Sequence, residues 1–285
     1  MIRRAVLLVC VILLSAVPAL GALQIDLPET VMNGRAFFVT VHSDSEFPVL
    51  LKWNEQEVPV EVSQTKHGYT GLALLALPRD FSKKTLAVTA IEENVVGTNT
   101  ITRTVPVKHK KYREQHLKVN KKYVELSKKS LDRHYAEKAN VRKVMENPLG
   151  NRMWDGKFIR PVSGSVSSEF GVQRFFNGKP RKPHSGVDLR GKTGTPIKAF
   201  ASGVVRIAAS HFFSGKVAYI DHGQGVVSIY CHMSKLLVHE GDRVKKGQVI
   251  GKVGATGRVT GPHLHFGVKI ANVAVDPMPL FSAKN

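Results

Sequence analysis

The stretch Gly261–Val268 reads GPHLHFGV and places two imidazoles one residue apart in an otherwise apolar run. In an extended strand, residues two apart point to the same face of the sheet. His263 and His265 would therefore stand side by side and could share one ion or one substrate. Two histidines on the wet face of a half-buried strand would show the same spacing, so partners elsewhere in the chain have to decide between the two interpretations.

A second motif, Pro183-His184-Ser-Gly-Val-Asp188-Leu, supplies partners of the right chemistry. It sets a histidine and a carboxylate four residues apart across a glycine. A neutral imidazole and a carboxylate are ligands that zinc takes at about 2.0 to 2.2 Å. With one histidine of the pair in GPHLHFGV, the ligand set becomes His, Asp, His. Three protein ligands leave a fourth tetrahedral position for water, which is typical of a catalytic rather than a structural site.

A further histidine, His232, follows the apolar run Val226–Cys231, which has the pattern of a strand. If His265 binds the metal, His263 and His232 remain to orient the water, to accept its proton or to stabilise an oxyanion. Cys231 next to it is expected to be a buried structural residue, because adjacent strand residues point to opposite faces. A peptide bond suits such a site, since the metal activates the water and polarises the scissile carbonyl.

The chain has 285 residues, which is enough for two domains with cores of their own. Residues 1–22 begin with a basic head at Arg3 and Arg4 and continue with an apolar run that ends in small residues. This pattern predicts a secretory signal peptide, with an uncleaved membrane anchor as the alternative. We therefore expect an exported protein of the periplasm, the extracellular space or the cell envelope. Cys231 is the only cysteine after residue 22, so no internal disulfide is expected.

Short alternating runs separated by turn formers fill residues 23–107. The clearest runs are Ala36–Val41, Pro48–Trp53, Val58–Val62 and Thr85–Ala90. Several short strands at this spacing predict an immunoglobulin-like β-sandwich.

Residues 108–155 are basic and helix-prone, which predicts a helical connector between two domains. Ser130 is expected to cap a helix over Leu131–Met145. The lysines and arginines of this segment contribute to a formal net charge of +20. In an exported protein such charge predicts attraction to anionic envelope surfaces, although a solvated linker would show the same run. No nucleic-acid-binding motif accompanies it, so nucleic acid is not expected as a partner.

Glycine-punctuated β runs return in residues 156–285, the part of the chain that holds the two histidine motifs. The runs are Gly203–Ala208, Lys216–Asp221, Val226–Cys231, Val249–Val253 and His265–Ile270. The segment Asp221–Gly225 between two of them predicts a hairpin turn. The whole chain is therefore expected to be mainly β, with an antiparallel β domain at its C-terminal end.

These motifs resemble the lysostaphin/LytM-type zinc metallo-endopeptidases. The resemblance rests on His184-x-x-x-Asp188, Tyr230-Cys-His232 and His263-x-His265, in that order. It continues through segments such as Ser168–Gly171 and Gly241–Gly251 and covers about Phe158 to Phe281 without a break. A chance His-x-His would not bring these other segments with it.

The resemblance implies a role for each of these side chains. It implies one zinc ion bound by His184, Asp188 and His265, with His232 and His263 as the catalytic histidines. It also implies a catalytic domain of lysostaphin/LytM type that hydrolyses the peptide stems and cross-bridges of bacterial peptidoglycan with a metal-activated water. A non-enzymatic activator of other cell-wall hydrolases is the alternative, but complete ligand and catalytic sets favour the enzyme.

Three further residues are expected to contact the substrate. Arg174 and Asn177 belong to the loop that precedes His184, and Tyr230 precedes His232.

Overall fold

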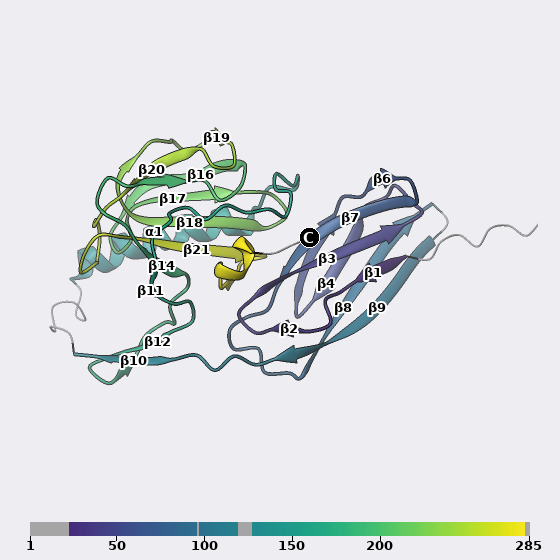
Figure 1. Ribbon diagram of the computed structural model, residues 1–285, viewed down its shortest axis with the longest axis horizontal. Coiled ribbons are helices and arrows are strands. Elements are labelled where there is room, and N and C mark those ends of the chain that lie inside the picture. Colours follow the sequence, from purple (N-terminus) through teal and green to yellow (C-terminus); the bar gives the residue numbers. More distant parts are fainter. Residues whose placement is uncertain (1–22, 96, 119–126, 283–285) are drawn as a thin grey trace, which may run out of the picture.

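The computed structural model describes residues 23–95, 97–118 and 127–282, which are coloured in Figure 1. The predicted signal peptide lies outside the described residues, as do Lys121 and Lys122 of the connector. Within the described ranges, no helix combines the length and the apolar character that crossing a membrane requires.

Residues 23–108 form two β-sheets around one core, drawn in purple and blue in Figure 1. One sheet has the order β1 (Gln24–Asp26), β3 (Ala36–Ser43), β7 (Gly68–Ala76), β6 (Ser63–Thr65). The other has the order β2 (Val31–Met32), β9 (Gly97–Lys108), β8 (Thr85–Asn94), β4 (Val49–Trp53), β5 (Gln56–Val60). The alternation in β3 buries Val39 and Val41 completely, and each such side chain contributes about 1.5 to 3 kcal/mol. The immunoglobulin-like character of this sandwich stays a prediction.

The connector helix α1 spans Lys128–Glu146 and begins earlier than the sequence predicts. The prediction that Ser130 caps it is wrong. Ser127 is the N-cap, and its hydroxyl accepts a hydrogen bond from the backbone N–H of Ser130 at 3.3 Å. The lysines at 128 and 129 have a high helix propensity and extend the helix by a turn toward the earlier serine.

The connector also contains a strand that the sequence does not reveal. β10 (Glu114–Leu117) pairs in parallel with β12 (Gln173–Phe176), which pairs in turn with β13 (Lys179–Pro180). Figure 1 shows β10 lying beside β12, below the main sheet of the C-terminal domain. β10 is polar and lacks an alternating apolar pattern, so only its distant partner strand defines it.

The C-terminal domain is built on one large antiparallel sheet. Its main order is β11 (Val166–Ser168), β14 (Val187–Arg190), β21 (His263–Ile270), β18 (Val226–Leu236), β17 (Gly215–Asp221), β16 (Gly203–His211), β19 (Arg243–Val244). The strand β20 (Val249–Val253) pairs with β15 (Pro196–Lys198) and β18, β22 (Val273–Val275) pairs with β21, and the 3-10 helix η2 (Met278–Phe281) follows. The predicted hairpin at Asp221–Gly225 is confirmed, because it joins the paired strands β17 and β18.

Two hydrophobic clusters join this domain to the rest of the chain. The larger contains the fully buried Phe200, Tyr230 and Phe266, and it includes Leu74 and Ala76 of β7 from the N-terminal sandwich. The smaller lies under α1, where Val144 and Met145 of the helix contact Cys231 and its neighbours. The sandwich and the helix therefore both pack on the C-terminal domain.

Candidate metal centre

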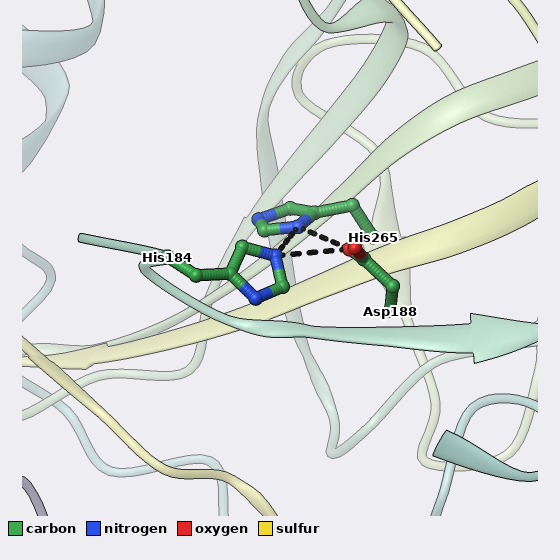
Figure 2. Close-up of side chains that lie close together, drawn as sticks. All are labelled: His184, Asp188 and His265. Atoms are coloured by element: carbon green, nitrogen blue, oxygen red, sulfur yellow. Dashed lines mark hydrogen bonds and ion pairs between the residues drawn. The ribbon is translucent and has the colours of Figure 1, made fainter. Parts of the chain in front are cut away.

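The pairing of β14 with β21 sets two of the expected ligands opposite each other. Asp188 pairs with His265 in this antiparallel ladder. His184 comes from the segment just before β14, and Figure 2 shows its ring pointing toward the other two side chains. Between the two ligands of this segment, a Cβ on Gly186 would stand 2.3 Å from the carbonyl oxygen of Phe266. Only glycine allows this close approach, which explains why a glycine stands between the two ligands.

Three ligand atoms form a small triangle. Nε2 of His184 lies 3.0 Å from Oδ1 of Asp188 and 2.9 Å from Nδ1 of His265. Nδ1 of His265 lies 2.9 Å from the same carboxylate oxygen. Ligand atoms on a tetrahedral zinc ion stand about 3.3 Å apart, so the triangle needs to open by only a few tenths of an ångström. Two imidazole nitrogens and a carboxylate oxygen therefore fit the donor set of zinc in both chemistry and spacing.

The ring of His184 is held in the orientation that a ligand needs. Its Nδ1 donates a hydrogen bond to the carbonyl oxygen of Glu169 at 2.8 Å. A carbonyl oxygen can only accept, so the proton sits on Nδ1 and the lone pair of Nε2 points to the centre. The side chain is 5% exposed, so its orientation is fixed by packing as well.

The charges of the ligands suit a cation. Burial by itself raises the pKa of Asp188, yet its contacts with His184 and His265 outweigh burial and bring the pKa far below its ordinary value. Burial lowers the pKa of His265, and the contact with Asp188 offsets part of that effect. At neutral pH the carboxylate is ionised and the His265 ring is neutral, which are the protonation states that metal binding requires.

Comparisons with known proteins cover the segment that holds this centre. Residues 182–277 match the family model described as peptidase family M23. The catalytic domain of the antimicrobial peptidase lysostaphin from Staphylococcus simulans is 35% identical, with coverage of 42% of this chain and 93% of that chain and a TM-score of 0.38. The chain belongs to peptidase family M23.

Two further comparisons concern longer parts of the chain. The peptidoglycan DD-endopeptidase ShyC of Vibrio cholerae is 41% identical over 137 residues, which are 47% of this chain and 28% of ShyC. The chain thus spans less than a third of the length of this curated relative. A solved Pseudomonas aeruginosa structure assigned to peptidase M23 is 29% identical, with coverage of 90% of this chain and 97% of that chain and a TM-score of 0.67. That similarity extends beyond the M23 domain into the N-terminal sandwich.

The M23 domain brings the two expected catalytic histidines to the edge of the ligand triangle. Nε2 of His263 lies 3.8 Å from Oδ1 of Asp188, and its Nδ1 donates to the carbonyl oxygen of Gly261 at 2.9 Å. Nδ1 of His232 donates to the carbonyl oxygen of Thr256 at 2.9 Å. The ring centroids of the two histidines are 5.0 Å apart. In both rings Nδ1 donates to a carbonyl, so in the neutral form of each ring the lone pair is on Nε2.

A β-bulge turns His232 toward the metal centre. Its φ of +63° lies in the left-handed region, which is uncommon for a residue other than glycine. The β17–β18 register runs from Lys216 with Met233 to Ala218 with Tyr230, so β18 holds one extra residue here. Burial lowers the pKa of His232 to about 4, and its hydrogen bond to Thr256 opposes only part of that shift. The ring is therefore neutral at physiological pH.

Cys231 pairs directly with His265 across the β18–β21 ladder but is not among the described residues whose ligand atoms converge on the centre. Cys231 is buried in the cluster under α1, beside Val144 and Tyr219. Burial raises the pKa of its thiol to about 12, so the thiol stays protonated at neutral pH. Cys231 therefore packs in the core under α1, as the sequence predicts.

The three residues expected to contact substrate lie in three different positions relative to the centre. Arg174 on β12 lies beside the centre, with Nη2 3.6 Å from Oδ2 of Asp188. Asn177 lies at the exposed turn between β12 and β13 and has a φ of +51°. The expectation for Tyr230 is wrong, because its side chain is fully buried and its hydroxyl accepts a hydrogen bond from the N–H of Phe200 at 2.8 Å. The bulge explains the error, since it breaks the two-residue alternation that would put Tyr230 on the same face as His232.

Several groups that complete the centre leave no signal in the sequence. The carbonyl oxygens of Glu169, Thr256 and Gly261 orient three of the four histidines. Any residue type supplies such a carbonyl, so the residue types at these positions do not reveal this role, even where a position such as Glu169 lies within the family resemblance. Ser168 is a different case, since it pairs with Asp188 across β11 and β14 and belongs to the family resemblance.

Proposed function

We propose that the chain is a zinc-dependent endopeptidase that hydrolyses peptide cross-links of bacterial peptidoglycan. The observation that carries the proposal is the triangle of His184, Asp188 and His265 with two histidines at its edge, each held through Nδ1 by a backbone carbonyl. The name of ShyC, a peptidoglycan DD-endopeptidase, supports the choice of substrate. The ligand side chains remain accessible to a peptide, since those of Asp188 and His265 are 13% and 16% exposed.

In this proposal, His184 holds zinc through Nε2, Asp188 through Oδ1 and His265 through Nδ1. When bound, zinc polarises the scissile carbonyl and lowers the pKa of the attacking water. The chain itself has to move protons and stabilise charge.

The two remaining histidines are placed for this proton transfer. The Nε2 atoms of His232 and His263 carry lone pairs, so each can accept a proton from the attacking water. A protonated ring can then donate to the leaving nitrogen or to the developing oxyanion. The carbonyls of Thr256 and Gly261 keep both rings in the required tautomer throughout.

The proposal includes export to the cell envelope, where peptidoglycan lies. The signal-like pattern of residues 1–22 supports it. The exposed basic residues of α1, which include Lys138 and Lys143, support an attraction of the connector to anionic envelope polymers.

Digestion of purified peptidoglycan by the protein without residues 1–22 tests the function. We expect cross-linked dimers to be converted to monomers, with the activity lost on chelation and restored by zinc. Mass analysis of the fragments identifies the bond, and Asp188→Ala is the inactive control. If zinc-loaded protein released nothing, the endopeptidase would be excluded. Stimulation of a second wall hydrolase by the same preparation would then support the regulator instead.

A further inference from the structure

Three arginines of the C-terminal domain come from segments that adjoin the metal centre. Arg174 is on β12, Arg181 follows β13, and Arg258 is in the loop before β21. The backbone N–H of Arg181 donates to the carbonyl oxygen of Arg174 at 2.8 Å, which sets these two neighbours across the hairpin. The pKa of the Arg258 guanidinium lies below its ordinary value, first because its surroundings desolvate the charge and then because Arg181 and Arg174 repel it.

Arg174 forms the wall of the centre on the Asp188 side. Its Nη2 donates to the hydroxyl of Ser168 at 2.9 Å, and that hydroxyl lies near the ring of His184. Its Nε is buried and has no hydrogen-bond partner among the described residues. Nη2 is 3.6 Å from Oδ2 of Asp188, which is beyond a good hydrogen bond. The contact with Ser168 therefore holds Arg174 in place, while its Nε has no hydrogen-bond acceptor among the described residues.

Arg258 belongs to the other side of the centre, where His232 lies. Its guanidinium lies over the ring of Phe213, 4.2 Å from the centroid, and its backbone N–H donates to the Phe213 carbonyl at 2.8 Å. Thr256, two residues earlier in the same loop, holds the ring of His232. A guanidinium stacked on an aromatic face keeps its N–H donors along its edge, where they can bind a planar anion.

The charge balance of this cluster favours an anion. Three guanidinium groups repel one another, and a bound zinc ion would add to the positive charge. The acid in contact with Arg174 is Asp188, whose carboxylate already serves the metal site. A carboxylate accepts charge-assisted, bidentate hydrogen bonds from arginine better than any other peptide group.

We propose that Arg174, Arg181 and Arg258 form a carboxylate-binding subsite that anchors an acidic residue of the substrate peptide next to the scissile bond. This inference rests on the proposed peptidase function. It makes the site selective for acidic peptides over the same peptides with their carboxyl groups amidated.

The test uses two muropeptide dimers that differ only in their free carboxyl groups, which are intact in one and converted to carboxamides in the other. Binding of each dimer to the chelated, metal-free protein is measured by fluorescence anisotropy, and kcat/KM is measured with zinc. We expect the wild type to prefer the carboxylate dimer by about tenfold or more in both assays. Arg258→Gln should weaken binding and kcat/KM for the carboxylate dimer by about tenfold and leave the carboxamide dimer unchanged.

Two further variants control for charge and folding. Arg243→Gln removes the same charge from an exposed position on β19 and should behave as the wild type. Arg181→Gln should reproduce Arg258→Gln, and it replaces that variant if the latter does not fold. Equal binding and cleavage of the two dimers by the wild type, or an equal loss on both in the variants, would overturn the subsite. A binding preference for the carboxylate dimer without cleavage of either dimer would support the subsite and refute the peptidase.

Discussion

Nδ1 of His265 lies 2.9 Å from Oδ1 of Asp188, its direct partner across the β14–β21 ladder. The ladder itself therefore fixes the distance between two ligands, and no loop has to order for them to meet. Only His184 comes from outside the paired strands, and the carbonyl of Glu169 holds its ring. A site preorganised in this way should bind its metal without large rearrangement.

Replacing a ligand should empty the site. We expect Asp188→Ala and His184→Ala to lower the zinc content from about one ion per chain to near zero and to abolish hydrolysis, because two donors do not hold zinc tightly. Metal analysis after dialysis, with thermal unfolding to confirm the fold, measures this. Retention of stoichiometric zinc by either variant would contradict the ligand assignment.

The His263–His265 pair should divide into a catalytic residue and a ligand. His263→Ala should keep most of the zinc and lower kcat by about 10² to 10⁴, the usual contribution of general acid–base catalysis. His265→Ala should lose both zinc and activity. Should His263→Ala empty the site while His265→Ala keeps its metal, the two assignments would have to be exchanged.

The connector helix should stabilise the loop that supports His232. The Glu137 carboxylate accepts hydrogen bonds from the Phe212 N–H at 2.9 and 3.0 Å, and the Ser214 carbonyl nearby accepts one from the N–H of His232 at 2.8 Å. We expect Glu137→Ala to lower the free energy of unfolding by about 1 to 3 kcal/mol in urea titrations, because a partly buried N–H loses its charged acceptor.

Glu146→Ala is the matched control on the same helix. Glu146 is exposed, and its ion pair among the described residues is a surface pair with Arg142 at 3.8 Å. Its removal should change the free energy of unfolding by less than about 0.5 kcal/mol. Similar losses in the two variants would mean that the Glu137 contact adds nothing specific.

His222 should make the fold less stable in mild acid. It is fully buried between the carbonyl of Ser202 and the hydroxyl of Ser228, and burial lowers its pKa to about 4. An unfolded histidine titrates near 6.5, so below that pH the unfolded state takes up a proton that the folded state refuses. The stabilisation is complete above about pH 6.5, and roughly 2 to 3 kcal/mol of it should be lost by pH 4.5.

Denaturant unfolding of the wild type and of His222→Gln at pH 7.5 and pH 4.5 isolates this effect from the other histidines. The wild type should lose more stability between the two pH values than the variant does. Equal losses in the two proteins would show that His222 takes up its proton without unfolding.

Local patterns were enough to predict most strands and all five histidine and aspartate positions of the centre. Alternation in β3 and β8 is a property of contiguous residues, and the His-x-His motif needs only an extended backbone to bring its rings together. The family resemblance then assigned roles that spacing had left open. The alternation and the family resemblance are both recognised from short motifs in the sequence.

The features that the sequence did not predict depend on distant partners. The strand β10 exists because β12 offers it an edge, and the bulge at His232 exists because β17 is one residue shorter than β18 at that point. Regular alternation predicts that Tyr230 and His232 share a face of the sheet, and that bulge puts them on different faces. Arg258 lies in a loop, and its contacts with the distant Phe213 position it.

The parallel pairing of β10 with β12 changes which fragment can be transplanted as a working unit. The family match begins at residue 182, after the carbonyl of Glu169 that orients His184 and after Arg174. The strand that backs Arg174 comes from still earlier, where the N–H of Gln173 donates to the carbonyl of Arg113 at 2.9 Å. A chimera joined at residue 182 would retain every ligand and lose its supports. Exchange of catalytic domains between relatives therefore calls for a junction ahead of Arg113.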